Sequence, residues 1–473
     1  MFSNIYSDKD FMKLTIFILF LLGLIGCNVQ KDLELRSIGI DDDAAAANAP
    51  VVESISPTSY CVKGGITITI TGSKFSEGDS VNVGGTNCPD VVVVSATEIT
   101  CTLPYHFASV VDVVVSNAQG ISGTLFNGFK YNSFLYVSNQ SGASFLYKMK
   151  IDSADGSITQ LGSTSVPNGA YGVEIDPSNT WVYTAGVLAN QIAAFTINHS
   201  TGDLTAVPGS PFAGGSGVDA VAVSKDSKCL IASNFYAASS AAVTSYSINQ
   251  TTGALVKVAD YTGGTQAGFL AIDPQNRFVF VTNYGSDNIS AYTMNTTNCT
   301  LAFVGNYSCG DAPDAISVHP SGKYVYTGNA SNSFTGGKGA VTALAVDQNT
   351  GALSIINTYL TADARRGSGV EIDKTGTQLY VTARGNDEAG TGKVFGYDIT
   401  STTGNLTEIN NWSSDDGPND VRILGSGKFV FTANTQADTV NVFIRDLGTG
   451  ILTPALTPSY PVGTSPGIIG ITF

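Results

Sequence analysis

Residues 172–184, GVEIDPSNTWVYT, contain two short runs of β-branched and aromatic residues joined by a turn segment with Asp and Pro. Such residues favour strands and Asp-Pro favours turns, so the stretch predicts an antiparallel strand pair. The second run recurs every 46 to 55 residues, starting at Phe134, Trp181, Leu230, Phe278, Tyr324, Leu379 and Phe429. This spacing is typical of a repeat with four strands.

The first run is the expected inner strand of each repeat. Six copies precede a second run, and the seventh, residues 468–473, lies at the C-terminus. The repeat that starts at Phe134 has no inner strand before it. Joining the two ends would complete one blade and leave no open sheet edge. The sequence therefore predicts an all-β fold with a seven-bladed β-propeller over residues 134–473, in which the two ends close one blade.

A hairpin of the form Asp/Asn-x-x-Thr-Gly-x-Leu lies within the repeats, as at residues 198–204, 249–255 and 347–353. Its glycine supplies the positive φ that the turn needs. Together with turns such as Asp176-Pro177 and Pro320-Ser-Gly-Lys323, the hairpins resemble the lactonase-type β-propeller family, which is related to bacterial 6-phosphogluconolactonases and fungal muconate lactonizing enzymes. These motifs are turns, so they indicate the fold and carry no chemistry.

The resemblance implies opening of a lactone, which needs a base to activate water and a cation or donors to hold the oxyanion. It also implies a Gly-Pro-Arg-His stretch at the start of an inner strand. No histidine occupies that place in the corresponding stretches, which read Gly217-Val-Asp-Ala220, Ala312-Pro-Asp-Ala315, Gly367-Ser-Gly369 and Gly417-Pro-Asn-Asp420. This departure argues against the family's lactonase activity.

Residues 51–131 have short β-runs separated by glycine pairs, which is typical of an immunoglobulin-like sandwich. The segment resembles the IPT/TIG family in Ile55-Ser-Pro57, Gly64-Gly65, Ile70-Thr-Gly72, Phe75, Val81-Asn-Val-Gly84, Cys88, Ile99-Thr-Cys101, Pro104, Asn117, Gly120 and Phe129. The resemblance implies a spacer or interaction module and a disulfide between Cys88 and Cys101.

The pairing of the other cysteines after residue 27 stays open from the sequence. Cys299 and Cys309 flank an extended run of ten residues, whose ends lie roughly 30 Å apart at about 3.3 Å per residue. A disulfide needs Cα atoms within about 7 Å, so these two are not expected to pair. The partners of Cys61 and Cys229 cannot be assigned.

Residues 14–26, LTIFILFLLGLIG, form an uncharged, mostly apolar run that is too short to span a bilayer and precedes Cys27. Residues 1–26 resemble a bacterial lipoprotein signal, which implies lipidation of Cys27; the alternative is an ordinary signal peptide with an incidental cysteine. Residues 27–50 lack periodicity and are expected to be a flexible tether. We therefore expect an exported protein, lipid-anchored to a bacterial membrane, at the outer membrane and either periplasmic or surface-facing.

Composition excludes several classes of function. The 23 Lys and Arg against 38 Asp and Glu give a net charge of −15, which argues against a nucleic-acid partner. The apolar share of 43% argues against a disordered chain. The three histidines have no metal-ligand spacing: His199 and His319 are expected to be structural and His106 to be a surface loop residue. We therefore expect no metal and no cofactor.

The loops that enter the inner strands and those that leave the second strands should share one face around the central channel. Arginines, carboxylates and aromatic rings on this face could bind a sugar acid or a peptide. Alternatively, the aspartates hold turns and the arginines neutralise them. The candidate ligand or catalytic residues are Tyr171, Asp219, Tyr284, Asp314, Arg365, Arg366, Arg384 and Asp420.

Three charged residues, Glu174, Glu371 and Arg422, share one mid-strand register. Neighbouring blades should place Glu371 near Arg422, and a structural ion pair is expected there.

The sequence favours a cell-envelope lipoprotein whose propeller is a protein- or glycan-binding module. The alternative is a lactone hydrolase that uses Arg365 or Arg366 for the substrate anion and a channel carboxylate as the base. A scaffold without a small-molecule site is the third possibility. An open polar channel would favour the first two hypotheses over the scaffold.

Overall fold

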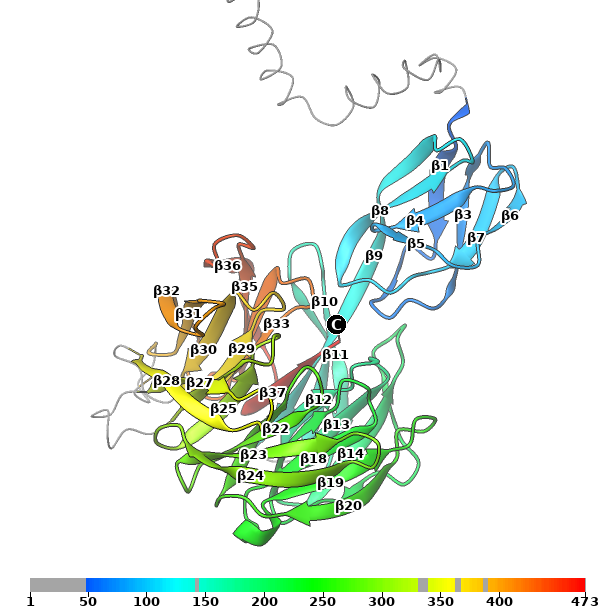
Figure 1. The fold of residues 1–473 in the computed structure, drawn as a ribbon. Helices are drawn as coiled ribbons and strands as arrows, with labels where there is room; N and C mark the ends of the chain where they lie inside the picture. The colour runs from blue at the N-terminus through cyan, green and yellow to red at the C-terminus, as the bar shows by residue number, and fades with distance from the viewer. Residues whose placement is uncertain (1–47, 141–143, 331–338, 362–366, 386–389, 473) are drawn as a thin grey trace, which may run out of the picture. The chain divides into compact units, whose positions relative to one another are not determined.

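The computed structural model describes residues 48–140, 144–330, 339–361, 367–385 and 390–472 (Figure 1). The signal segment, Cys27 and all but the last residues of the expected tether lie outside these ranges. Two compact units are present: one of residues 48–58, 65–104 and 111–129, and one of residues 59–64, 105–110 and 130–472. Within the described ranges, no helix has both the length and the apolar character needed to cross a membrane.

The first unit is the expected sandwich. One sheet has the strand order β1-β3-β7-β6, and the other contains β8, β4 and β5. Alternate residues of the strands are buried, as in β3, where Ile68 and Ile70 face inward and threonines face outward. The strands of residues 51–116 are β1 (Val51–Ser56), β2 (Ser59–Cys61), β3 (Thr67–Ser73), β4 (Ser80–Val83), β5 (Thr86–Asn87), β6 (Val92–Ser95), β7 (Glu98–Thr102) and β8 (Ser109–Ser116).

Cys88 and Cys101 do not form the disulfide that the family resemblance implied. Both are buried free cysteines, and a hydrogen bond joins the two side chains. This hydrogen bond and burial raise the pKa of the Cys101 thiol. The thiolate, which is the form that reacts to make a disulfide, is therefore disfavoured at Cys101.

The second unit contains seven four-stranded antiparallel blades. The inner strands are β12 (Ala170–Ile175), β17 (Val218–Val223), β21 (Ala267–Ile272), β25 (Pro313–Val318), β29 (Gly367–Ile372), β33 (Pro418–Ile423) and β37 (Pro466–Ile471). The second strands are β13 (Trp181–Gly186), β18 (Cys229–Asn234), β22 (Phe278–Asn283), β26 (Tyr324–Asn329), β30 (Gln378–Ala383), β34 (Phe429–Asn434) and the end of β9 (Ser122–Asn139).

The outer half of each blade is a hairpin of a third and a fourth strand. The third strands are β14 (Gln191–Ile197), β19 (Val243–Ile248), β23 (Asn288–Asn295), β27 (Ala340–Val346), β31 (Lys393–Ile399), β35 (Thr439–Arg445) and β10 (Phe145–Ile151). The fourth strands are β15 (Leu204–Ala206), β20 (Leu255–Tyr261), β24 (Thr300–Ser308), β28 (Leu353–Leu360), β32 (Leu406–Ser413), β36 (Leu452–Pro461) and β11 (Ile158–Ser165). A short strand β16 (Phe212–Ala213) also pairs with β14, and a single 3₁₀ turn, η1 (Ser239–Ala241), precedes β19.

The closing blade confirms the prediction that the two ends of the repeat region meet. The C-terminal strand β37 pairs antiparallel with β9, with Ile469 opposite Val137 and Ile471 opposite Leu135. On the other side of β9 the sheet continues with β10 and then β11 (Figure 1). The ring is therefore held shut by main-chain hydrogen bonds between segments more than 300 residues apart in the sequence.

A repeated contact, which we call the blade clasp, joins the outer hairpin of one blade to the second strand of its neighbour. In six of the seven joints the hairpin glycine has a positive φ and lies directly against the first residue of that second strand, so a Cβ there would come within 2.5 Å of its side chain. Only glycine allows this approach. The six pairs are Gly156 with Phe429, Gly202 with Phe134, Gly253 with Trp181, Gly351 with Phe278, Gly404 with Tyr324 and Gly450 with Gln378.

The remaining clasp is a disulfide that the sequence analysis did not assign. Cys229 is the first residue of β18, and Cys299 occupies the hairpin turn between β23 and β24 with a φ of 57°. Their sulfurs are bonded, with Cα atoms 5.4 Å apart. The two cysteines therefore take the places that a large side chain and a glycine hold at the other joints. Cys309 is a buried free cysteine, as is Cys61.

Candidate functional site

The inner strands surround a cavity of about 590 Å³ in the channel of the propeller. The fifth residue of every inner strand lines it, because alternate residues of a strand face the same side. Four of these residues are small, which leaves the space that three charged side chains enter. The fifth residues in order are Glu174, Ala222, Ala271, Ser317, Glu371, Arg422 and Gly470.

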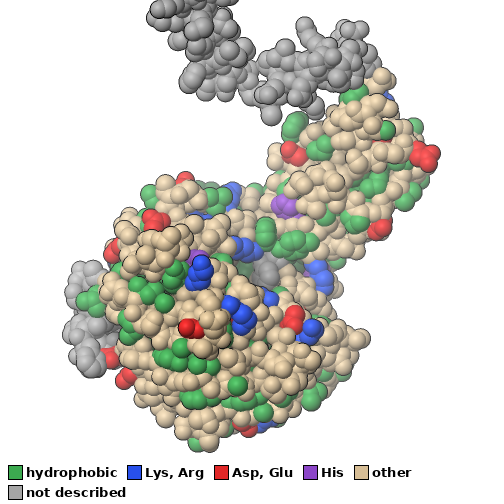
Figure 2. Space-filling model, viewed as in Figure 1, with side chains coloured by type: hydrophobic (Ala, Val, Ile, Leu, Met, Phe, Trp, Pro, Cys, Tyr) green, Lys and Arg blue, Asp and Glu red, His purple; other side chains and the backbone are tan. Residues whose placement is uncertain are grey.

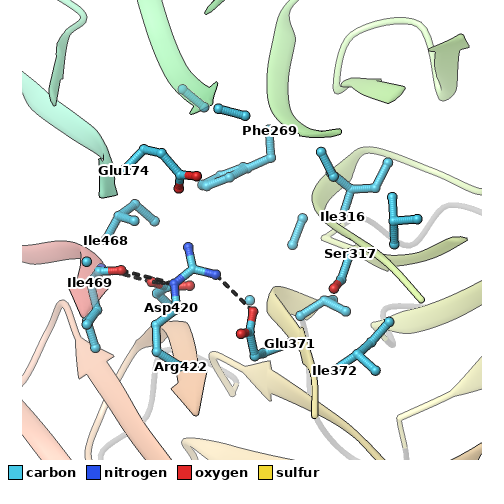
Figure 3. A pocket seen from close by; sticks show the side chains of 18 of the residues that line it. Glu174, Phe269, Ile316, Ser317, Glu371, Ile372, Asp420, Arg422, Ile468 and Ile469 are labelled. Carbon is cyan, nitrogen blue, oxygen red and sulfur yellow. Dashed lines mark hydrogen bonds and ion pairs between the residues drawn. The ribbon is translucent and has the colours of Figure 1, made fainter. Parts of the chain in front are cut away.

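Arg422 is held in a fixed position by two carboxylates and a carbonyl group. Its Nη1 lies 3.1 Å from Oε2 of Glu371, and its Nε lies 3.2 Å from Oδ2 of Asp420. Nε also donates to the carbonyl oxygen of Ile469 at 3.0 Å, and the amide of Ile469 donates to Asp420 Oδ2 at 2.9 Å (Figure 3). The predicted ion pair between Glu371 and Arg422 is confirmed. It joins β29 to β33, and Asp420 and Ile469 extend it to β37.

Glu174 reaches the same space from β12 (Figure 3). Among the described residues it has no ion pair, and its carboxyl group accepts a hydrogen bond from the amide of Val223. Burial raises the pKa of Glu174 to about 7, against partial lowering by Lys225 and Arg422. A carboxyl group with this pKa can both accept and return a proton near neutral pH.

Two lysines stand at the rim of the cavity below the inner strands. Lys225 and Lys374 follow β17 and β29, and both line the cavity. Partial burial and the charge of Lys225 lower the pKa of Lys374 to about 8. Lys374 Nζ also lies 3.8 Å from the centre of the Phe107 ring. On the face of the propeller seen in Figure 2, Lys and Arg side chains gather around a hollow.

Phe269 lines the cavity, and the lining extends to Lys225 and Lys374, beyond the ends of β17 and β29. The Phe269 side chain extends from β21 into the channel (Figure 3). Its ring packs edge-on against Tyr171, with the centroids 5.6 Å apart. The cavity therefore belongs to the side of the channel where the inner strands end, which we call the lower face. The upper face carries the loops that enter the inner strands and leave the second strands.

Four of the predicted site residues come together on the upper face, around Asn419. Asn419 accepts a hydrogen bond from Arg384 and donates one to the Tyr171 hydroxyl at 3.4 Å. Burial and the charges of Asp314 and Asp219 raise the pKa of Tyr171. Burial, with the charge of Asp314, raises the pKa of Asp219 well above its ordinary value.

The other four predicted residues are placed differently or lie outside the described residues. Asp420 lines the cavity and binds Arg422. Tyr284 follows the end of β22, and its ring centre lies 6.3 Å from that of Phe235. Arg365 and Arg366 fall in the undescribed range 362–366.

Several site residues escaped the sequence analysis. Asn419 was overlooked because it is not titratable, and Lys225 and Lys374 because they follow the inner strands. Glu174 was noticed only as a member of the mid-strand register. Alignment of the inner strands by their fifth residue would have placed Glu174 and Arg422 in one ring, on either side of Gly470.

His319 and His199 lie at turns, and His106 lies in the irregular segment between β7 and β8. His319 Nε2 lies 2.9 Å from the carbonyl oxygen of Gly376, and its Nδ1 lies 2.7 Å from Ser321 Oγ. Burial lowers the pKa of His199 to about 4. Across the ranges that the structure describes, no three His, Cys, Asp or Glu side chains are grouped so as to hold a metal ion.

Comparison with solved structures shows the same propeller fold in proteins of low sequence identity. A putative 6-phosphogluconolactonase from Bacteroides fragilis is 17% identical, with a TM-score of 0.61, over 72% of this chain and 98% of the other. The periplasmic gluconolactonase PpgL from Pseudomonas aeruginosa is 18% identical, with a TM-score of 0.62, over 72% and 99%. Identities this low show the fold alone.

Sequence comparison identifies both units. Fibrocystin-L from Mus musculus is 37% identical over 70 residues, which are 15% of this chain and 2% of that protein, so the chain spans only a small part of this relative. The IPT/TIG domain model matches residues 50–132. The model described as "Lactonase, 7-bladed beta-propeller" matches in overlapping segments from residue 129 to residue 465. The chain therefore belongs to the seven-bladed β-propeller lactonase family and carries an IPT/TIG domain before its propeller.

Proposed function

We propose that the protein hydrolyses the ester bond of a small lactone in the cavity on the lower face, which we call the lower cavity. The observation that carries this proposal is Glu174, a carboxyl group with a pKa of about 7 that faces a fixed guanidinium, Arg422, across the cavity (Figure 3). A base that titrates near the working pH and a cation near the reacting carbonyl are the two groups that lactone opening requires.

In the proposed reaction, ionised Glu174 accepts a proton from a water molecule while the water oxygen attacks the carbonyl carbon of the lactone. The carbonyl oxygen gains negative charge, which Arg422 stabilises. When the tetrahedral intermediate collapses, the ring C–O bond breaks and Glu174 returns its proton to the leaving alkoxide oxygen. The product is an open-chain hydroxy acid. Glu371 and Asp420 act as positioning residues, since they hold Arg422.

The family and its solved members support this proposal at the level of fold. Two of those structures are described as a putative 6-phosphogluconolactonase and a gluconolactonase, so both phosphorylated and unphosphorylated sugar lactones belong in the test. The stretch Gly417-Pro-Asn-Asp420, which departs from the family's Gly-Pro-Arg-His, opposes a direct transfer of the family's catalytic residues to this chain.

The test is hydrolysis of a panel of such lactones by the purified chain and by Glu174→Gln. Loss of the base should lower kcat by about a hundredfold or more. Glu77→Gln is the matched control, because Glu77 is exposed in the first unit. Activity that is equal in Glu174→Gln and the parent would exclude Glu174 as the base. An Arg365→Ala/Arg366→Ala variant tests the alternative that the sequence offers, in which these arginines bind the substrate anion. If this variant alone loses activity, the lower-cavity proposal is wrong.

We propose as a second candidate that the propeller is a binding module for a protein or a glycan at the cell envelope. The specific observation in its favour is the polar group of Tyr171, Asp219, Asp314 and Arg384 around Asn419 on the upper face. The lipid anchor at Cys27 and location at a bacterial membrane are part of this proposal, and they rest on the sequence of residues 14–27. Pull-down of envelope proteins by the purified chain tests the protein branch.

A further inference from the structure

Exposed apolar side chains follow the second strands of three consecutive blades on the upper face. Leu188 comes after β13, Phe235 and Tyr236 after β18, and Tyr284 after β22. Leu188 and Tyr236 are each 61% exposed, and Phe235 and Tyr284 are half-buried. We call these four residues, a leucine and three aromatic residues, the aromatic arc.

The arc is held in place although it is exposed. The rings of Phe235 and Tyr236 meet edge to face at 5.4 Å and 88°, and Phe235 also contacts Tyr284. Gly217 has a φ of +66°, and a Cβ on it would lie 2.5 Å from Cδ2 of Tyr236. The Tyr236 ring therefore rests against the bare backbone of Gly217, a close approach that a side chain at this position would block.

Hydrogen-bonding groups adjoin the arc on the same face. Asp219 lies two residues after Gly217, the glycine that supports Tyr236, and it belongs with Tyr171, Asp314 and Asn419 at the second position of the inner strands. The side chain of Asp219 is buried, and no hydrogen bond or ion pair to its carboxyl group occurs among the described residues. The upper face thus combines flat apolar surface with donors and acceptors at its centre.

We propose that this upper face binds a glycan, with the C–H face of a sugar ring stacked on Tyr236 and Phe235 and its hydroxyl groups bonded to Tyr171 and Asp219. A sugar ring has both kinds of surface that the site offers, since its C–H bonds are attracted to the negative faces of aromatic rings. This inference deepens the binding-module candidate and rests on it. It is independent of hydrolysis in the lower cavity.

The size of the arc favours a sugar over a protein. Two side chains at 61% exposure and two half-buried ones present on the order of 300 Å² of apolar surface. A stable protein interface buries about 800 Å² on each partner. The arc is therefore large enough for one or two sugar rings and too small to be the core of a protein interface.

The test is calorimetric titration of the purified full chain with oligosaccharides of three or more glucose, galactose, mannose or N-acetylglucosamine units. We expect at least one to bind, and Tyr236→Ala to weaken it by about tenfold, whereas Tyr236→Phe retains most of the affinity. Leu447→Ala is the matched control, because Leu447 is also 61% exposed but lies in the hairpin between β35 and β36 on the lower side. It should leave the affinity unchanged.

Three results would overturn the inference. The first is that no oligosaccharide of the panel binds at millimolar concentration. The second is equal affinity in Tyr236→Ala, and the third is loss of affinity in Glu174→Gln, which would locate the sugar in the lower cavity. If the chain instead self-associates through the arc, sedimentation will show a dimer that Tyr236→Ala dissociates, and the glycan proposal is again wrong. If the chain captures envelope proteins but binds no oligosaccharide, the binding-module candidate still holds and the glycan is excluded as its ligand.

Discussion

At the scale of single residues, the charged groups of the lower cavity depend on one another. Burial raises the pKa values of Glu371 and Asp420 even though Arg422 binds both. Glu174 has no such ion pair among the described residues, and its pKa rises from an ordinary value of 4.5 to about 7. Ionised Glu174 is therefore the unfavourable state of this cavity, and the fold tolerates it at neutral pH.

This unfavourable state predicts a pH-dependent stability difference between Glu174→Gln and the parent. Between pH 4.5 and pH 7 the folded protein holds a proton that the unfolded chain has released, so the stabilising contribution of Glu174 is full below 4.5 and lost as the pH rises through 7. Glutamine cannot ionise. At pH 8 the free energy of unfolding of Glu174→Gln should therefore be higher than that of the parent. We expect a difference of about 2 kcal/mol, because a half-buried side chain is partly screened by solvent.

Urea unfolding at pH 4 and pH 8 measures this difference. At pH 4 the two proteins should have nearly equal stability, since the carboxyl group is then protonated in both the folded and the unfolded state. A gap of the same size at both pH values would show that the effect comes from packing and not from ionisation.

At the scale of elements, the blade clasp explains how seven separate sheets form one ring. The hairpin glycine of one blade rests on the first residue of the neighbouring second strand, and tyrosines two residues further along that strand add a hydrogen bond. The hydroxyl of Tyr136 donates to Gly202, that of Tyr183 to Gly253, and that of Tyr380 to Gly450. The same joint thus recurs with small changes, and the disulfide is its covalent variant.

The disulfide clasp yields a stability prediction. Cys229 and Cys299 close a loop of 70 residues. Replacing both by alanine should lower the free energy of unfolding by up to about 4 kcal/mol, because the unfolded chain gains conformational entropy without the cross-link. Cys229→Trp/Cys299→Gly rebuilds the clasp of Trp181 and Gly253 and should recover part of the loss. Thermal unfolding with and without reductant checks this: reductant should lower the Tm of the parent and leave both variants unchanged. A rebuilt variant no more stable than the alanine variant would contradict the equivalence of the joints.

At the scale of the whole molecule, the ring and the anchor are separate features. The ring is closed by β37 on β9, with Ser133 and Thr472 bonded across the joint. The lipid at Cys27 stays a prediction from residues 14–27, which lie outside the described part of the chain. Neither feature needs the other, because the propeller buries its own core.

Cys27→Ser tests the anchor. If Cys27 carries a lipid, the parent should partition into the detergent phase of a bacterial lysate and the variant into the aqueous phase, since each buried CH₂ of an acyl chain contributes about 0.8 kcal/mol to membrane binding. Asn28→Ala keeps Cys27 and should behave as the parent. Equal partitioning of parent and Cys27→Ser would refute lipidation at this residue.

The repeat, the number of blades, the closing of the ring and the sandwich were determined by the sequence alone. Strand alternation, turn residues and the hairpin glycines act within a few residues, and the offset of residues 468–473 from the repeat at Phe134 is visible in the order of the chain. The pairing of Glu371 with Arg422 was also predictable, because one register repeats in adjacent blades.

Only the tertiary structure decided the disulfide, the position of the cavity and the grouping of the upper-face residues. Cys229 meets Cys299 because a hairpin of one blade reaches the neighbouring blade, a contact across 70 residues. Glu174 and Arg422 come together on either side of β37, and Asn419 contacts Tyr171 from 248 residues away. Such contacts depend on how blades stack and how far small residues such as Ala222 and Gly470 open the channel, and no local pattern encodes these distances.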